Sequence, residues 1–188
     1  MGLHRAGFDV TGVDLIPQPH YPFRFIQADA LQTPLDSFDL IWASPPCQAH
    51  TTLRGLGKAK TSDIDLIPTI RQRLQKAGCS FWVIENVVGA PLENPARLCG
   101  SSFGLAVRRH RLFEANFSIP RLLCSCRSRR NTGVYGKRPG DRLPDGVHRA
   151  ANLAEGRAAM GIDWMNWREL TQAIPPAYAE HIGKQICN

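Results

Sequence analysis

The sequence predicts an α/β fold in which buried strands bring reactive side chains to one edge of a sheet. Two apolar runs, Phe38–Ser44 and Phe81–Ile84, have the length of strands and are apolar enough to be buried on both faces. A helical pattern near Asp65–Ala77 lies between them. Ligands of open α/β sheets bind at the carboxyl ends of the strands. The residues that follow each run are therefore the first candidates for a functional site.

The composition is that of a globular protein with one sizeable core. The chain has 188 residues, of which 43% are hydrophobic and 21% are charged. No stretch approaches the roughly 18 uninterrupted apolar residues of a membrane span. The first residues lack the basic and then apolar pattern of a secretory signal. The sequence therefore favours a cytoplasmic protein that does not insert into a membrane.

Two short strands are expected near the start of the chain, and each ends in an acid. The first, within Gly7–Asp14, ends at Asp14, and the second, Phe23–Ala30, ends around Asp29. An acid at this position of a nucleotide-binding sheet can accept hydrogen bonds from ribose hydroxyls. Asp14 alone is equally compatible with a helix N-cap. Together, the two acids suggest a nucleoside pocket.

The run Phe38–Ser44 leads into Pro45, Pro46, Cys47 and Gln48. The prolines end the strand and place Cys47 on a rigid loop at its carboxyl end. A cysteine at that position is either a nucleophile or a small buried hydrophobic residue after a turn. This stretch alone does not decide between the two.

Further candidates follow the later strands. Glu85 and Asn86 come directly after the run Phe81–Ile84, beside Cys47 if the two strands are neighbours. Alternation in a strand at Leu112–Phe117 and the residues before it places Arg109 and Arg111 on one face. Two guanidinium groups on one face suit a partner with several oxygen acceptors.

The formal net charge of +7 is concentrated in one part of the sequence. Between Arg108 and Arg149 there are eleven lysines or arginines and three acids, so the rest of the chain is nearly neutral. This pattern favours a polyanionic partner, and the alternative is a solvated loop. We divide the chain into a core at 1–117, a basic module at 118–150 and a returning part at 151–188. The returning part has helices at Asn152–Met160 and Ala177–Ile186.

The six cysteines do not suggest a disulfide framework. Cys124 and Cys126 are close in sequence, but no second close pair of cysteine or histidine follows them. A zinc site that combines them with His148 is the open alternative. No metal is therefore assigned from the sequence.

Several motifs occur in the order found in the DNA cytosine-5 methyltransferases, and the chain resembles that family over most of its length. The nucleophile motif Pro-Pro-Cys-Gln corresponds to residues 45–48, and the Glu-Asn-Val motif corresponds to residues 85–87. The Gln-x-Arg-x-Arg motif corresponds to residues 107–111, with Val107 in place of glutamine. Residues 157–161 and 172–176 resemble the last two motifs.

The resemblance implies a Rossmann-like methyltransferase sheet that uses S-adenosylmethionine and acts on cytosine in DNA. It makes Cys47 the nucleophile at carbon 6 and Glu85 the acid at ring N3. The remaining implied roles are base or phosphate contacts for Arg109 and Arg111, cofactor binding for Asp14, Asp29 and Pro45, and substrate binding for Gln48 and Asn86. Carbon 5 then takes the methyl group, and β-elimination releases the cysteine. A bacterial or phage-type context, such as restriction–modification, is compatible with this activity.

The chain differs from the family pattern in three places. The family begins with a strand and a Phe-x-Gly-x-Gly loop, whereas residues 1–7 resemble the helix after that loop. Strands near Val10 and Ile41 are therefore expected to lack a neighbour. The region 118–150 is short for a target-recognition domain. The last motif, Gln172–Pro175, lacks the usual Gly-Asn pair.

Three explanations of the first difference are open: a true start further upstream, a partner chain that supplies the strand and loop, or a re-paired sheet. The alternative function is accordingly a catalytically inactive DNA-binding remnant or subunit.

Overall fold

A computed structural model describes residues 1–47, 50, 64–128, 131–136, 139 and 148–187 of the chain. The chain forms two compact units. The first comprises residues 1–30, 99–109 and 122–188, and the second comprises residues 31–98 and 110–121. The chain passes repeatedly between them, and the expected boundaries at 117 and 150 stay a prediction. We describe each unit by itself.

The first unit contains a small parallel sheet of two strands, β1 (Thr11–Asp14) and β2 (Arg24–Gln27). Both strands lie within the predicted ranges, and both are shorter. Asp14 lies opposite Gln27 in the register of the pair, so Asp14 and Asp29 follow the same edge of this sheet. Among the described residues, β2 is the one hydrogen-bonded neighbour of β1.

Helices make up the rest of the regular structure in the described part of the first unit. They are α1 (Gly2–Arg5), the 3-10 helix η2 (Gly100–Phe103), α3 (Leu153–Met160), α4 (Trp167–Gln172) and α5 (Pro176–Gly183). The prediction of helices for α3 and α5 is confirmed. The side chain of Asn152 caps α3 by accepting from the Glu155 N–H at 2.9 Å, and Pro176 begins α5, where a proline is tolerated. The six-residue α4 was not predicted. Its capping box joins Asn166 and Glu169.

Helices α3 and α4 form a core with residues from the segment predicted as a basic module. Val107, Val134, Met160 and Leu170 are buried in this core. Gly133 exchanges backbone hydrogen bonds with His148 and Ala150, and the Thr132 N–H donates to the Ala106 carbonyl at 2.7 Å. Residues 132–134 and 148–150 are therefore part of the first unit rather than a separate loop. The basic positions 129, 130, 137, 138 and 142 lie outside the described residues.

Gly156 allows α3 and α4 to pack closely, because a Cβ there would lie 2.8 Å from Cζ3 of Trp167. The indole of Trp167 is buried and held by its Nε1 hydrogen bond to the Gly136 carbonyl, at 3.1 Å. Gly156→Ala should therefore destabilise the protein by about 1–3 kcal/mol, although alanine is more favourable than glycine at an exposed helix position. Urea denaturation measures the change. The control Ala158→Gly, at an exposed position of α3, should cost no more than about 1 kcal/mol. A stabilised Gly156→Ala protein would contradict this packing.

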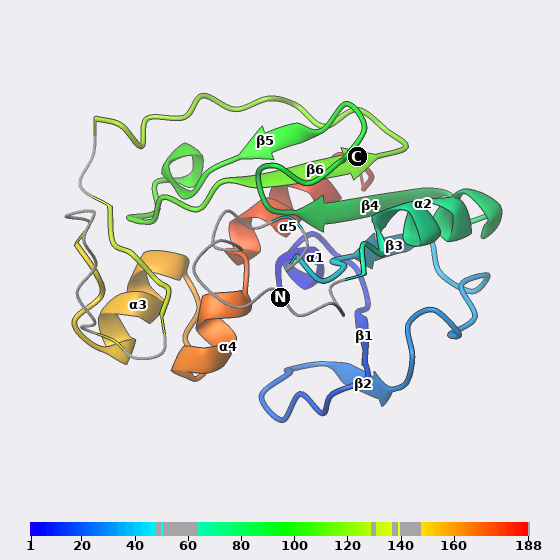
Figure 1. The fold of residues 1–188 in the computed structure, drawn as a ribbon, viewed down its shortest axis with the longest axis horizontal. Helices are drawn as coiled ribbons and strands as arrows, with labels where there is room; N and C mark the ends of the chain where they lie inside the picture. Colours follow the sequence, from blue (N-terminus) through cyan, green and yellow to red (C-terminus); the bar gives the residue numbers. More distant parts are fainter. Residues whose placement is uncertain (48–49, 51–63, 129–130, 137–138, 140–147, 188) are drawn as a thin grey trace. The chain divides into compact units, whose positions relative to one another are not determined.

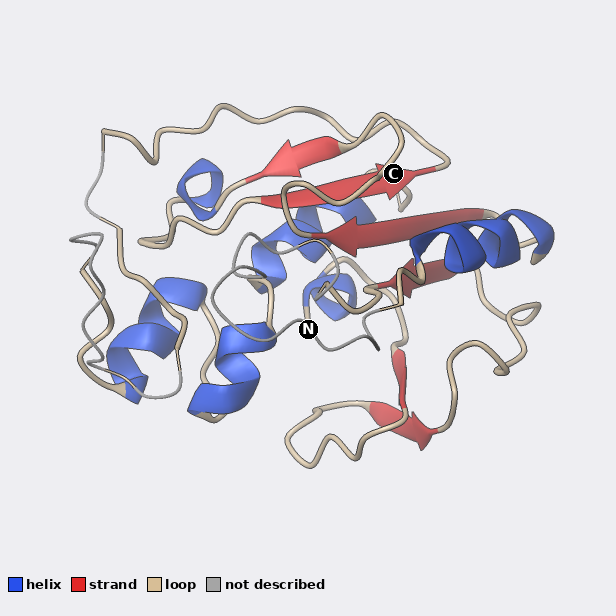
Figure 2. Cartoon of the chain, viewed as in Figure 1, coloured by secondary structure: helices blue, strands red, loops and turns tan. Residues whose placement is uncertain are grey.

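The second unit contains a mixed sheet of four strands (Figures 1 and 2). Its strands are β3 (Leu40–Ala43), β4 (Phe81–Asn86), β5 (Ala96–Leu98) and β6 (Arg111–Ala115), in the order β3-β4-β6-β5. Strands β3 and β4 are parallel neighbours, whereas β6 is antiparallel to both of its neighbours. Among the described residues, β3 pairs with β4 alone. The structure is therefore α/β, with one mixed sheet and one small parallel sheet.

One face of the four-stranded sheet packs against α2 (Ile67–Lys76), the helix predicted at Asp65–Ala77. Leu74 of α2 is buried with Trp82 and Ile84 of β4. The opposite face carries Trp42 and Phe113, whose rings make an edge-on contact at 5.7 Å between centroids. In the described part of the chain, no helix is long and apolar enough to cross a bilayer.

Candidate active site

Three strands bring predicted catalytic residues to one edge of the four-stranded sheet. Strands β3 and β4 are parallel, so their carboxyl ends, which lead to Cys47 and Glu85, meet at the same edge. Strand β6 runs antiparallel to β4, so its first residue, Arg111, lies at that edge too. The strand order thus gathers a thiol, a carboxylate and a guanidinium group from three segments of the second unit. We call these three residues the edge cluster.

The loop that carries Cys47 is fixed to β4 by Asn86. The Nδ2 of Asn86 donates to the carbonyl of buried Pro45 at 3.1 Å, and its Oδ1 accepts from the Val87 N–H at 2.8 Å. Cys47 is half-buried, and its carbonyl accepts from the His50 N–H at 2.9 Å. Asn86 is 2% exposed and Pro45 is buried, so both hold the loop in this structure. Their predicted contacts with substrate and cofactor stay predictions, and Gln48 lies outside the described residues.

Glu85 and Arg111 form an ion pair across neighbouring strands. Glu85 lies opposite Phe113 in the register, so Arg111, two residues earlier, is its diagonal neighbour on the same face. The Arg111 Nε lies 3.1 Å from the Glu85 Oε1, and the side chains are 18% and 10% exposed. The Nη1 of Arg111 also donates to the His110 carbonyl at 2.9 Å. The guanidinium group therefore fixes the direction of the carboxylate at the sheet edge.

Arg109 has a different position from the one expected. Strand β6 begins at Arg111, so strand alternation does not extend to Arg109. The guanidinium group of Arg109 is buried in the first unit and donates to the carbonyls of Val134, at 3.0 Å, and Thr171. Its own carbonyl accepts from the Tyr178 hydroxyl at 2.7 Å. The structure therefore uses Arg109 to hold segments of the first unit together, and of the predicted arginine pair only Arg111 belongs to the edge cluster.

Of the predicted cofactor acids, Asp14 is the last residue of β1 and Asp29 comes two residues after β2, both in the first unit. Both are half-buried. The Asp14 carboxylate accepts from the Ile16 N–H at 2.9 Å and from the Gln18 side chain at 3.2 Å. Leu15 and Ile16, directly after Asp14, are large apolar residues that are about two-thirds exposed. The Asp14 carboxylate thus lies next in the chain to exposed apolar side chains at this edge of the small sheet.

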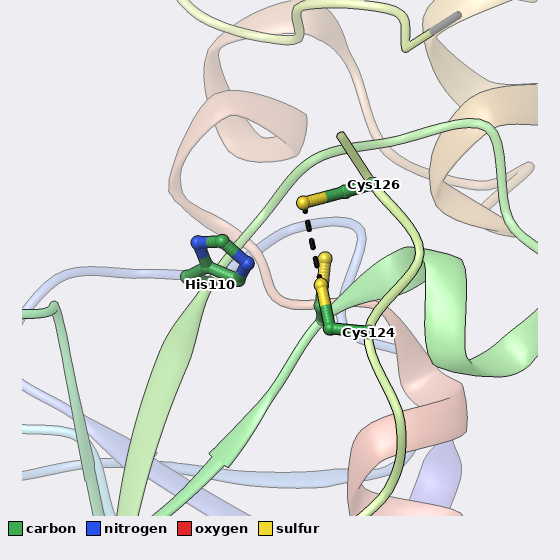
Figure 3. Close-up of side chains that lie close together, drawn as sticks. His110, Cys124 and Cys126 are labelled. Atoms are coloured by element: carbon green, nitrogen blue, oxygen red, sulfur yellow. Dashed lines mark hydrogen bonds between the residues drawn. The ribbon is translucent and has the colours of Figure 1, made fainter. Parts of the chain in front are cut away.

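A second cluster of reactive groups consists of three cysteines and a histidine. One ligand atom from each of Cys99, His110, Cys124 and Cys126 lies within 4.8 Å of the others. Figure 3 shows the thiols of Cys124 and Cys126 joined by a hydrogen bond of 3.3 Å, with the ring of His110 beside them. Burial raises the pKa of Cys126 to about 11, and the neighbouring thiols add to this rise.

The cluster differs from the alternative zinc site that the sequence suggested. The Nε2 of His148 lies 2.6 Å from the Glu155 Oε1 instead of near the two cysteines. Sequence reasoning missed Cys99 and His110, because neither lies close in the chain to Cys124.

Comparison with known proteins adds no assignment to either cluster: no protein-family model matches the chain, and no curated protein matches it.

Proposed function

We propose that the chain is a DNA cytosine-5 methyltransferase in which the edge cluster acts on the base. The observation that carries this proposal is the arrival of Cys47, Glu85 and Arg111 at one edge of one sheet. A thiolate is a nucleophile for an electron-poor ring carbon, and a carboxylic acid at a ring nitrogen makes that carbon more electrophilic. The motifs at residues 45–48 and 85–87 fit the same chemistry.

The proposed steps use the residues as follows. The Sγ of Cys47 forms a bond to carbon 6 of cytosine, while Glu85 donates a proton or hydrogen bond to N3 and Arg111 holds the carboxyl group in place. The electron pair of the carbon 5–carbon 6 double bond then becomes available at carbon 5. S-adenosylmethionine, when bound, supplies the methyl group that carbon 5 receives. The carbon 5 proton then passes to solvent, the proton at N3 returns to Glu85, and cleavage of the sulfur–carbon bond restores the aromatic ring and releases Cys47 as a thiolate.

The small parallel sheet of the first unit fits the nucleoside part of such a cofactor. Asp14 and Asp29 follow the same edge of that sheet, and a carboxylate oxygen can accept more than one hydrogen bond. The exposed side chains of Leu15 and Ile16 offer apolar surface for a base. The proposal also includes a partner chain that supplies a further strand and a loop to the cofactor site.

A DNA substrate fits the charge distribution. The formal net charge of +7 arises from the segment between Arg108 and Arg149, and phosphate contacts supply much of the affinity of DNA-binding proteins. A target base in duplex DNA must leave the stack to reach a thiol.

The first test needs no methyl donor. Addition of Cys47 to carbon 6 makes carbon 5 protonatable, so the protein should catalyse exchange of the carbon 5 hydrogen of cytosine with solvent. Duplex DNA labelled at that hydrogen measures the exchange, and transfer from labelled S-adenosylmethionine is measured in parallel. Cys47→Ser should reduce both rates to background, whereas Cys79→Ser, between α2 and β4, should leave both unchanged.

The outcomes separate the two candidate functions. Folded protein that binds DNA but gives neither exchange nor transfer would support the inactive DNA-binding remnant and overturn the enzyme. Cys47-dependent exchange without transfer would support the roles of the edge cluster and overturn full methyltransferase activity in this chain. Normal rates in Cys47→Ser would show that Cys47 is not the nucleophile.

A further inference from the structure

We propose that Cys99, His110, Cys124 and Cys126 bind one Zn²⁺ ion. These residues offer three thiols and one imidazole, and one ligand atom from each lies within 4.8 Å of the others. Three cysteines and one histidine are a ligand set of structural zinc sites. The proposal is independent of the edge cluster, since it involves neither Cys47 nor Glu85.

Local structure accounts for the approach of these four residues. Leu98 of β5 pairs with Arg111 of antiparallel β6, so the residues one step beyond this pair are Cys99 and His110. Cys124 and Cys126 lie on a separate segment, whose turn is closed by the hydrogen bond from the Ser128 N–H to the Ser125 carbonyl, at 3.2 Å. The cluster thus combines Cys99 and His110, next to the last β5–β6 pair, with Cys126 of one tight turn and with Cys124, one residue before that turn. His110 directly follows Arg109 in the chain.

The distances between the ligand atoms require only small adjustments for tetrahedral zinc. Zinc–sulfur bonds of about 2.3 Å at the tetrahedral angle place two sulfur atoms roughly 3.8 Å apart. The Sγ atoms of Cys124 and Cys126 are 3.3 Å apart, joined by a hydrogen bond that a metal would replace. Because the four ligand atoms already lie within 4.8 Å of one another, shifts of less than about 1 Å suffice.

Ser101 supplies hydrogen bonding around the sulfur atoms. Its hydroxyl donates to the Cys99 Sγ at 3.4 Å and lies 3.5 Å from the Cys124 Sγ. The same oxygen accepts from the Ser125 N–H at 3.2 Å. Ser101 is 6% exposed, so a buried hydroxyl lies between the two cysteine segments. Such outer contacts orient the ligands of metal sites and are part of their design.

The chemistry of the cluster favours zinc and a structural role. Thiolates and imidazole suit a borderline-soft cation better than magnesium or calcium, which prefer oxygen ligands. Four protein ligands complete a tetrahedron and leave no position for a substrate. Binding forms three zinc–sulfur bonds and one zinc–nitrogen bond, and the thiol protons pass to solvent. The ion would join the segment at Cys99 to the one at Cys124 and Cys126, both in the first unit, and thereby hold the start of the basic segment.

The metal content and the reactivity of one thiol test the proposal. The full chain, purified without chelator, should contain one zinc per chain by elemental analysis. Cobalt(II) in its place should give the visible absorption of a tetrahedral thiolate site. Cys124 is exposed, so iodoacetamide should modify it only after a chelator removes the zinc, whereas exposed Cys187 should react in both states. Mass spectrometry maps the modified residues within the same molecules.

Variants provide a second readout. Cys124→Ser should reduce zinc content to well below one per chain and lower the melting temperature, whereas Cys79→Ser should retain one zinc. His110→Cys should keep the metal and shift the cobalt spectrum toward that of four sulfur ligands. If His110 did not bind the metal, the same substitution would leave the spectrum unchanged. A folded protein that has no zinc even after incubation with Zn²⁺ would overturn the proposal. So would a Cys124–Cys126 disulfide in chain purified under reducing conditions.

Discussion

Replacement of Glu85 by glutamine is expected to lower the rate of methyl transfer by at least about 100-fold per folded molecule. Glutamine keeps the size of the side chain but cannot give a proton to ring N3. Its amide also cannot form the charged contact that Arg111 now makes at 3.1 Å. The free energy of unfolding should fall by only about 1 kcal/mol, since the ion pair at 3.1 Å becomes a neutral contact and Arg111 keeps its bond to the His110 carbonyl.

Single-turnover assays at saturating DNA and labelled S-adenosylmethionine measure this effect. Exchange of the carbon 5 hydrogen should fall in parallel, because Glu85 acts when Cys47 adds to the ring and therefore before methyl transfer. Glu93→Gln is the matched control, since the Glu93 side chain is 66% exposed. Transfer by Glu85→Gln at the rate of this control would remove Glu85 from the proposed mechanism. Loss of transfer with unchanged exchange would move its role to a later step.

The sequence predicts the part of the edge cluster that depends on local patterns. The apolar runs that become β3 and β4 end at prolines or polar residues, so the sequence alone locates their carboxyl ends. Parallel pairing of consecutive strands then placed Glu85 beside the Cys47 loop. The acids after β1 and β2 were placed at one edge for the same reason. In each case neighbouring segments of the chain also pair in the structure.

Long-range contacts account for what the sequence did not predict. Strand β5 has three residues with exposed Arg97 in the middle, which is too short for an alternating pattern. Arg109 donates to carbonyls 25 and 62 residues away, and no local signal distinguishes it from Arg111. The antiparallel register of β5 with β6 brings Cys99 and His110 together, and sequence spacing does not reveal that register.

Two glutamate–arginine pairs occupy the same sheet and differ in their surroundings. Glu85 on β4 meets Arg111 at the edge to which Cys47 is brought, whereas Glu114 on β6 meets Arg71 of α2. The second pair has two contacts, from Nε at 2.6 Å and from Nη2 at 2.8 Å, and Glu114 also accepts from the Glu93 N–H at 2.8 Å. The hydrogen bond and charge of Glu114 raise the pKa of Arg71, in spite of its partial burial. The Glu85–Arg111 pair therefore suits the proposed catalytic role. The Glu114–Arg71 pair suits attachment of α2 to the sheet.

Glu114→Gln is accordingly expected to destabilise the protein by about 3 kcal/mol. Glu114 accepts from three donors, and the amide group of glutamine would turn N–H donors toward some of them. The Arg71 charge would then lack its buried carboxylate, whose side chain is 4% exposed. For a chain of this length the melting temperature should fall by roughly 10 °C, measured by circular dichroism. Glu93→Gln should change the stability by less than about 0.5 kcal/mol, because its contact with Arg71 is exposed.

The activity of the two glutamine variants decides whether the two pairs have separate roles. Methyl transfer per folded Glu114→Gln molecule, measured well below its melting temperature, should stay within about twofold of the unmodified chain, because Glu114 lies on the α2 face of the sheet. Glu85→Gln should show the reverse pattern, with a large loss of rate and a small loss of stability. Equal losses of rate in both variants would mean that the sheet as a whole, rather than the carboxylate of Glu85, sets the activity. Since both substitutions remove one carboxylate from neighbouring strands, the difference between them isolates the contribution of the position at the edge.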